Sequence, residues 1–76
     1  MTVQQVRELY HSDIIPKKAR TEIRVKFAVH FNLYDTYPFQ RLIRLDSKKI
    51  PSPEQFEFLA KIIPEYYNHY LKNLQP

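Results

Sequence analysis

The stretch RTEIRVKFAVHFNLYDTYPFQRLIRLDSKKIPSPEQFEFLAKII, residues 20–63, decides the fold of this 76-residue chain. Between Ile23 and Leu33, apolar and polar side chains alternate, which is the period-2 pattern of a half-buried β-strand. The same segment also has a helical pattern, because Ile23, Phe27 and Phe31 recur at every fourth position. One interpretation leads to an α+β module and the other to an all-α protein.

Length favours the helical interpretation. A strand from Thr21 to Tyr34 would run to 14 residues, well beyond the usual length of about 5–6. Its only candidate partner, Phe39–Leu45, is shorter, and the apolar side chains of that segment fall on both faces. We therefore expect an all-α fold, a small helix-turn-helix bundle of four to five helices. The alternative is an α+β fold with a hairpin at about residues 21–45.

As a helix, residues 17–33 carry a second apolar row of Val25, Val29 and Leu33 on a nearly opposite side. A helix that is apolar on two sides is expected to be mostly buried. We expect the core to be formed by Phe27, Ala28, Phe31, Leu33, Phe39, Leu42, Phe56 and Leu59.

Capping residues place the other helices. Thr2, followed three residues later by Gln5, predicts a helix over about residues 3–11. A helix over residues 36–46 is predicted to begin at Asp35 or Thr36.

The strongest helix start in the chain is Ser52-Pro53-Glu54, which predicts a helix to about Ile63. Pro64 is expected to end, kink or restart it, so residues 64–76 form a candidate C-terminal interaction helix.

Composition limits the function. The chain has no Gly, which excludes phosphate-binding loops and leaves left-handed backbone positions to residues such as Asn32. It also has no Cys for a disulfide or a thiolate metal site. A single domain, 1–76, is expected. With no bilayer-length apolar run and no signal-peptide pattern, we expect a cytoplasmic protein without membrane contact.

Positive charge is concentrated in the first two thirds of the chain. Residues 1–50 contain ten Lys and Arg against five Asp and Glu, whereas residues 51–76 contain two against three. Such an asymmetry suits a polyanionic partner on one side, although an ordinary solvated basic face would give the same count.

Residues 19–63 resemble small bacterial helix-turn-helix proteins of the phage-repressor type. The resemblance is carried by Phe27-Ala28, by Phe31-Asn32-Leu33 at the turn, by the apolar anchors of residues 39–43, and by the helix that Ser52 opens. It departs from the pattern in lacking both family glycines, in a longer turn and in the position of Pro38.

The resemblance implies a sequence-specific, double-stranded-DNA-binding transcriptional regulator that inserts helix 36–46 into the major groove. The expected base contacts are Thr36, Tyr37, Gln40, Arg41 and Arg44. The expected phosphate contacts are Lys17, Lys18, Arg24, Lys48 and Lys49.

The C-terminal segment offers a candidate homodimer interface formed by Tyr66, Tyr67, Tyr70, Leu71 and Leu74. The same aromatic surface supports the alternative function, a non-catalytic protein-interaction module of the adaptor or antirepressor type. A third hypothesis, tied to the α+β fold, places Arg24, Lys26, His30 and Tyr34 on the open face of a nucleic-acid-binding sheet.

No catalytic constellation is expected. The three histidines, His11, His30 and His69, are far apart, and no second His or carboxylate follows any of them at helical metal-ligand spacing. We expect no enzyme activity, no metal, no cofactor and no small-molecule substrate.

Overall fold

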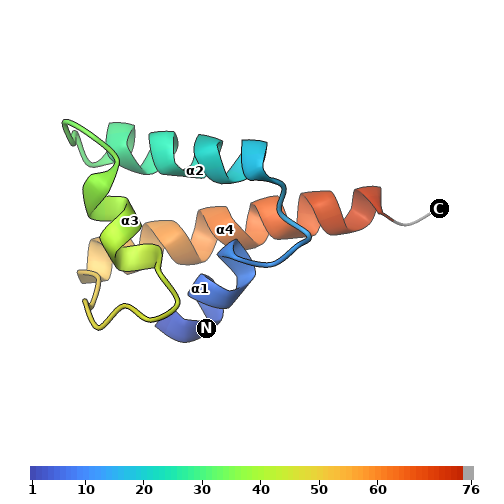
Figure 1. Ribbon diagram of the computed structural model, residues 1–76, viewed down its shortest axis with the longest axis horizontal. Helices are drawn as coiled ribbons and strands as arrows, with labels where there is room; N and C mark the ends of the chain where they lie inside the picture. Colours follow the sequence, from blue (N-terminus) through green and yellow to red (C-terminus); the bar gives the residue numbers. More distant parts are fainter. Residues whose placement is uncertain (75–76) are drawn as a thin grey trace.

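The computed structural model describes residues 1–74 and contains four α-helices, with no strand among these residues (Figure 1). They are α1 (Val3–Tyr10), α2 (Lys17–His30), α3 (Tyr37–Ile43) and α4 (Pro53–Asn73). The all-α prediction is confirmed, and the alternative hairpin at residues 21–45 is wrong. α4 packs against α1 and α2, α2 also packs against α3, and α2 and α4 run antiparallel.

The segment that could be strand or helix forms α2. The apolar side chains that recur at every fourth position along it are the ones that lie in the core. Ala19, Ile23 and Phe27 are all 0% exposed. The second row was expected to be buried as well, and that expectation is wrong, since Val25 is 49% and Val29 is 74% exposed. The reason is geometrical: α3 and α4 cover neighbouring sides of α2 and leave the opposite side open to solvent.

α2 ends in a Schellman-type turn. Asn32 has the positive φ angle of 54°, which confirms that asparagine takes the left-handed position in this glycine-free chain. The Leu33 amide donates to the Ala28 carbonyl at 2.8 Å, and the Asn32 amide donates to the Val29 carbonyl at 3.2 Å. These bonds satisfy carbonyls at the helix end and fix the direction in which the chain leaves toward α3.

Capping boxes start α1 and α4 at the two helix starts that the sequence predicts, although the box was expected only at Thr2. In each, a hydroxyl accepts from a backbone amide while a glutamine side chain accepts from the cap amide: Thr2 with Gln5, and Ser52 with Gln55. The helix was expected to end, kink or restart at Pro64, and an end there is wrong, since α4 continues through it to Asn73. The cost of an internal proline is about 3 kcal/mol, and apolar packing on both sides of Pro64 outweighs it.

The core lies where α1, α2 and α3 meet α4. The buried cluster is formed by Val6, Tyr10, Ile15, Ala19, Ile23, Phe27, Phe39, Leu42, Ile43, Leu59 and Ile63. Of the expected core residues, Phe31, Leu33 and Phe56 are only half-buried and pack around its edge. Three buried residues come from the first 15 positions, outside the segment that the sequence pattern singles out.

Candidate nucleic-acid interface

α3 is amphipathic and begins at an aspartate turn. Asp35 Oδ1 accepts a hydrogen bond from the Tyr37 amide at 2.9 Å, whereas the Thr36 side chain makes no capping bond. Inside the helix, Phe39, Leu42 and Ile43 are buried. The helix is shorter than the expected range of 36–46, because Arg44 already has extended backbone angles.

The loop after α3 is held by one buried arginine from α1. Arg7 is 7% exposed. Its Nε donates to the Leu42 carbonyl at 2.8 Å, Nη1 to the Ser47 carbonyl at 3.2 Å and Nη2 to the Lys49 carbonyl at 2.7 Å. One guanidinium therefore caps the C-terminal end of α3 and fixes the following loop.

Hydrogen bonds from His11, Ser47 and Arg20 also stabilise the ends of α3 and α1. His11 Nε2 lies 2.9 Å from the Ile43 carbonyl, and because a carbonyl only accepts, this nitrogen is the donor. Ser47 Oγ donates to the Arg41 carbonyl at 2.6 Å and accepts from the Lys49 amide at 3.1 Å. Arg20 of α2 binds the end of α1: its Nε donates to the Tyr10 carbonyl at 3.1 Å, and its Nη2 donates to the Ser12 carbonyl at 3.0 Å.

Two shallow hollows lie on the α3 side of the molecule. The first, about 320 Å³, follows the loop and is lined by Arg41, Arg44, Asp46, Ser47, Lys48 and Lys49. The second, about 400 Å³, lies between α2 and α3, and its polar lining includes Lys17, Arg20, Thr21, Arg24, Gln40 and Arg44. Because Arg44 lines both hollows, the two form one continuous basic surface, called the α3 face below.

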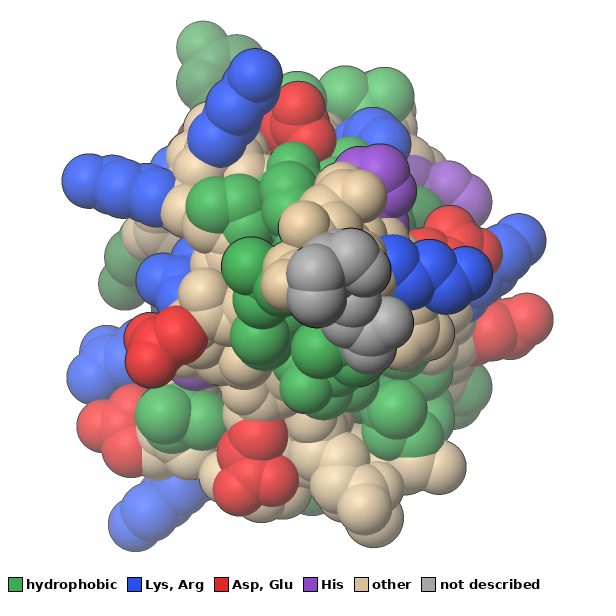
Figure 2. Space-filling view, turned by 90° about the vertical axis from the view of Figure 1, so that its right-hand side faces the viewer, with side chains coloured by type: hydrophobic (Ala, Val, Ile, Leu, Met, Phe, Trp, Pro, Cys, Tyr) green, Lys and Arg blue, Asp and Glu red, His purple; other side chains and the backbone are tan. Residues whose placement is uncertain are grey.

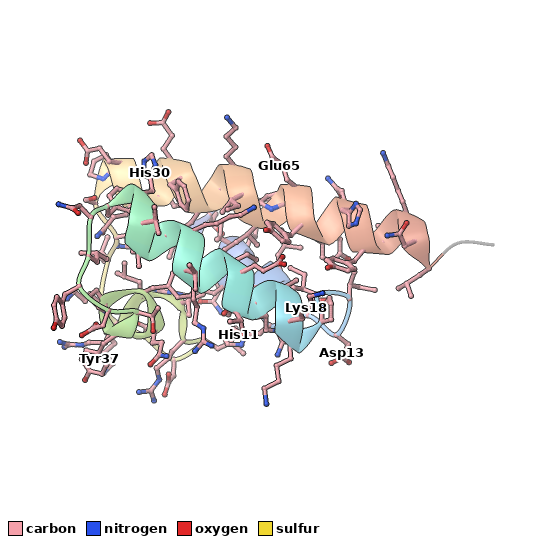
Figure 3. All side chains as sticks on the ribbon, turned by 90° about the horizontal axis from the view of Figure 1, so that it is seen from above. His11, Asp13, Lys18, His30, Tyr37 and Glu65 are labelled. Carbon is pink, nitrogen blue, oxygen red and sulfur yellow. The ribbon has the colours of Figure 1, made fainter. Side chains whose placement is uncertain are left out.

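The structure brings most of the expected DNA-contact residues to this α3 face. Gln40, Arg41 and Arg44 line its hollows, as do Lys17, Arg24, Lys48 and Lys49. Tyr37 is 61% exposed and lies on the opposite side of the molecule from Glu65 of α4 (Figure 3). Thr36 is half-buried, and Lys18 is exposed on α2 but lines neither hollow.

Two arginines of the α3 face contact neighbouring side chains. The Arg41 guanidinium carbon lies 5.8 Å from the Tyr37 ring centre, one helical turn away. Arg44 Nε lies 3.3 Å from Asp46 Oδ1, but both side chains are about 70% exposed. Such an exposed ion pair contributes little and leaves Arg44 free to exchange partners.

One titratable group beneath the α3 face is perturbed. Burial raises the pKa of Tyr10 above its ordinary value of 10.0, and the charges of Arg24 and Arg20 oppose this only partly. The neutral Tyr10 hydroxyl donates to the Arg20 carbonyl at 3.2 Å. Tyr10 is therefore a structural hydrogen-bond donor that joins α1 to α2.

The expected interface residues of the C-terminal segment divide into two groups. Tyr66, Tyr67 and Tyr70 are half-buried and pack against the core, with Lys26 Nζ 4.9 Å from the Tyr66 ring centre. Leu71 is half-buried and Leu74 is 65% exposed. Figure 2, which views the end of the molecule where α4 finishes, shows hydrophobic side chains gathered in the middle of this face.

Residues 1–74 contain no cluster of three or more metal-ligating side chains. No helix of this part of the chain is long and apolar enough to cross a membrane. The chain matches no family model, no curated protein and no solved structure. The resemblance to helix-turn-helix proteins therefore rests on residues 27–33, 39–43 and 52–63 alone.

Proposed function

We propose that this protein is a sequence-specific, double-stranded-DNA-binding transcriptional regulator that inserts α3 into the major groove. The observation that carries the proposal is the division of α3. Its apolar side chains anchor it in the core, while Gln40, Arg41 and Arg44 face the hollows of a continuous basic surface. This is the arrangement that a recognition helix requires.

The side chains on α3 and at Arg44 directly after it have the chemistry for base recognition. Arg41 and Arg44 each present a planar guanidinium that can donate two hydrogen bonds to guanine, and Gln40 can pair in the same way with adenine. An α-helix with its side chains is about 10–12 Å across, which matches the roughly 12 Å width of the major groove. Thr36 and Tyr37 at its N-terminal end complete the proposed base-contact set.

The flanking lysines would set affinity and orientation. Lys48 and Lys49 follow α3 in the loop that Arg7 holds, and Lys17 and Arg24 lie across the α2–α3 hollow. These cations flank α3 on two sides, where the phosphate backbones beside a groove would run. Lys18 lies outside both hollows and is proposed only as a peripheral contact.

A homodimer is the proposed binding form, joined at the end of α4 through the half-buried Leu71 and the exposed Leu74. Two copies related by a two-fold axis would read two half-sites about one helical turn, roughly 34 Å, apart. The alternative, an interaction module working through the aromatic side chains of α4, has less surface to use. Tyr66, Tyr67 and Tyr70 already pack against the core of their own chain.

A salt-dependent gel-shift assay with duplex DNA tests the proposal. Lys48→Ala together with Lys49→Ala should weaken binding to all sequences and reduce the slope of log K against log salt by about 0.9 per lost phosphate contact. The matched control is Lys61→Ala with Lys72→Ala, which removes the same charge from α4. If both double variants bind alike, or the wild type binds no better than a protein of equal charge, the proposal fails.

A further inference from the structure

A second surface lies on the other side of α2, in the groove between its C-terminal end and α4. This hollow of about 530 Å³ has the half-buried Phe58 and Ile62 as its apolar lining. His30 stacks on Phe58, with ring centres 4.6 Å apart and planes at 26°, and holds that ring in place. Figure 3 shows His30 at this edge of α2, beside α4.

Carboxylates dominate the rim of this groove. Glu54, Glu57 and Glu65 line it, all exposed, and Lys61 is the only Lys or Arg in its lining. The groove is therefore acidic around an apolar floor, the opposite of the α3 face. A ligand that fits it must combine a positive charge with an apolar anchor.

The chain itself carries a segment with that chemistry. Ile50 is 83% exposed, and both lysines before it, Lys48 and Lys49, are exposed. The backbone of this loop is fixed, because Arg7 Nη2 donates to the Lys49 carbonyl at 2.7 Å and Ser47 Oγ accepts from the Lys49 amide. An isoleucine presented on a rigid loop loses little conformational entropy when it binds, which favours docking.

We propose that the Lys48-Lys49-Ile50 loop of one copy docks into the acidic groove of a second copy. Ile50 would contact Phe58 and Ile62, and the two lysines would face Glu54 and Glu57. The two surfaces are complementary in charge and shape. The loop presents the Ile50 side chain, called the knob below, beside two cations, and the groove is an apolar hollow bordered by carboxylates. At 83% exposure, Ile50 does not fill the groove of its own chain.

The knob and the groove are different surfaces of the same molecule. In the proposed single contact each pairing leaves one knob and one groove free, so copies add head to tail, whereas a two-fold dimer would make the same contact twice. Since Lys48 and Lys49 also belong to the α3 face, assembly would compete with DNA. That last consequence rests on the proposed function, whereas the self-association does not.

Sedimentation velocity over a range of protein concentrations, at low and high salt, tests the contact. The wild type should gain mass with concentration and lose it with salt. Ile50→Ser on the knob and Glu57→Lys in the groove should each weaken this self-association by roughly tenfold or more. The matched controls are Val29→Ser, another exposed apolar residue, and Glu8→Lys, an exposed acid on α1; both should assemble like the wild type.

Mixing the two interface variants gives the decisive result. Both variants also carry Leu74→Ser, which removes the proposed contact at the end of α4. The Ile50→Ser copy then keeps an intact groove and the Glu57→Lys copy keeps an intact knob, so the mixture should form a heterodimer and nothing larger. A wild type that stays monomeric at every concentration overturns the inference, as do controls that lose assembly equally or a mixture that does not pair. Because the readout is mass, a failure of DNA binding would leave it unchanged, and circular dichroism of each variant verifies folding.

Discussion

Replacing Arg7 by Met should destabilise the fold far more than replacing any exposed arginine. The substitution keeps a long apolar side chain against the core but removes the three donors that hold the Leu42, Ser47 and Lys49 carbonyls. The Leu42 carbonyl is the critical one, because its bond to Arg7 is buried and water would not replace it. The Ser47 and Lys49 bonds are partly buried, so water can replace them in part.

The expected loss follows from these bonds. A buried carbonyl left without a donor costs about 1–3 kcal/mol, and the two partly buried carbonyls add a smaller amount. The Met variant avoids the cost of burying a charge, which offsets part of the loss. We expect a net decrease of about 2–4 kcal/mol in the free energy of unfolding. A 76-residue domain has roughly 4–11 kcal/mol in total, so this is a large share.

Urea unfolding followed by far-ultraviolet circular dichroism measures the effect. The matched control is Arg24→Met, because within residues 1–74 the only hydrogen bond of that side chain joins it to the exposed Thr21 hydroxyl at 3.3 Å. We expect the control to stay within about 0.5 kcal/mol of the wild type. Equal stability of the Arg7 and Arg24 variants would refute the assignment of Arg7 as the support of α3.

Three further substitutions test the core, α4 and the buried tyrosine by the same unfolding assay. Phe27→Ala should cost about 3–5 kcal/mol because the ring is fully buried, whereas the half-buried Phe31→Ala should cost only about 1–3; equal losses would contradict the packing. Pro64→Ala should stabilise the protein by about 1–2 kcal/mol by restoring a helical hydrogen bond, and a destabilised variant would count against the continuous helix. Since burial raises the pKa of Tyr10, its contribution is complete below pH 10.0 and is lost as the pH rises through the folded-state pKa. Tyr10→Phe should therefore be less sensitive to alkali than the wild type, and an unchanged alkaline loss would show that Tyr10 is not responsible.

Local signals in the sequence were sufficient to predict most of the helices. Thr2 and Ser52 start helices because each is followed three residues later by a glutamine that completes a capping box. Asn32 takes the left-handed position because the chain has no glycine to place there. The strand-like alternation of residues 23–33 is compatible with α2, because Ile23 and Phe27 lie on the side of the helix that packs in the core. The alternating residues Val25 and Val29 lie on its solvent-exposed side.

The features that the sequence did not predict depend on contacts between distant residues. Arg7 and Leu42 are 35 positions apart, so no pattern near Arg7 marks it as the cap of α3. Pro64 locally favours an end, a kink or a restart of the helix, yet α4 does not end there, because apolar side chains before and after it pack against the core. Burial of Val25 and Val29 was over-predicted because apolar periodicity does not show how many sides of a helix the rest of the chain covers.

The candidate site was predictable in composition but not in arrangement. Arg41 and Arg44 were expected on the outer side of α3 from the spacing of its apolar residues, and they line the basic hollows there. Lys18 was expected with the same set but lies outside the hollows. The acidic groove beside Phe58 was missed, although six of its seven lining residues recur at helical spacing along α4 and only His30 comes from α2.

Selection from a randomised duplex DNA library, at two salt concentrations, tests the central claim most directly. The wild type, Arg41→Ala and Lys48→Ala are compared. We predict that the wild type enriches a defined sequence. Arg41→Ala should lose preference at one base pair at a cost of about 1–3 kcal/mol, whereas Lys48→Ala should weaken binding to all sequences alike. If the wild type enriches no sequence, or if Arg41→Ala and Lys48→Ala change binding in the same way, then α3 does not read DNA.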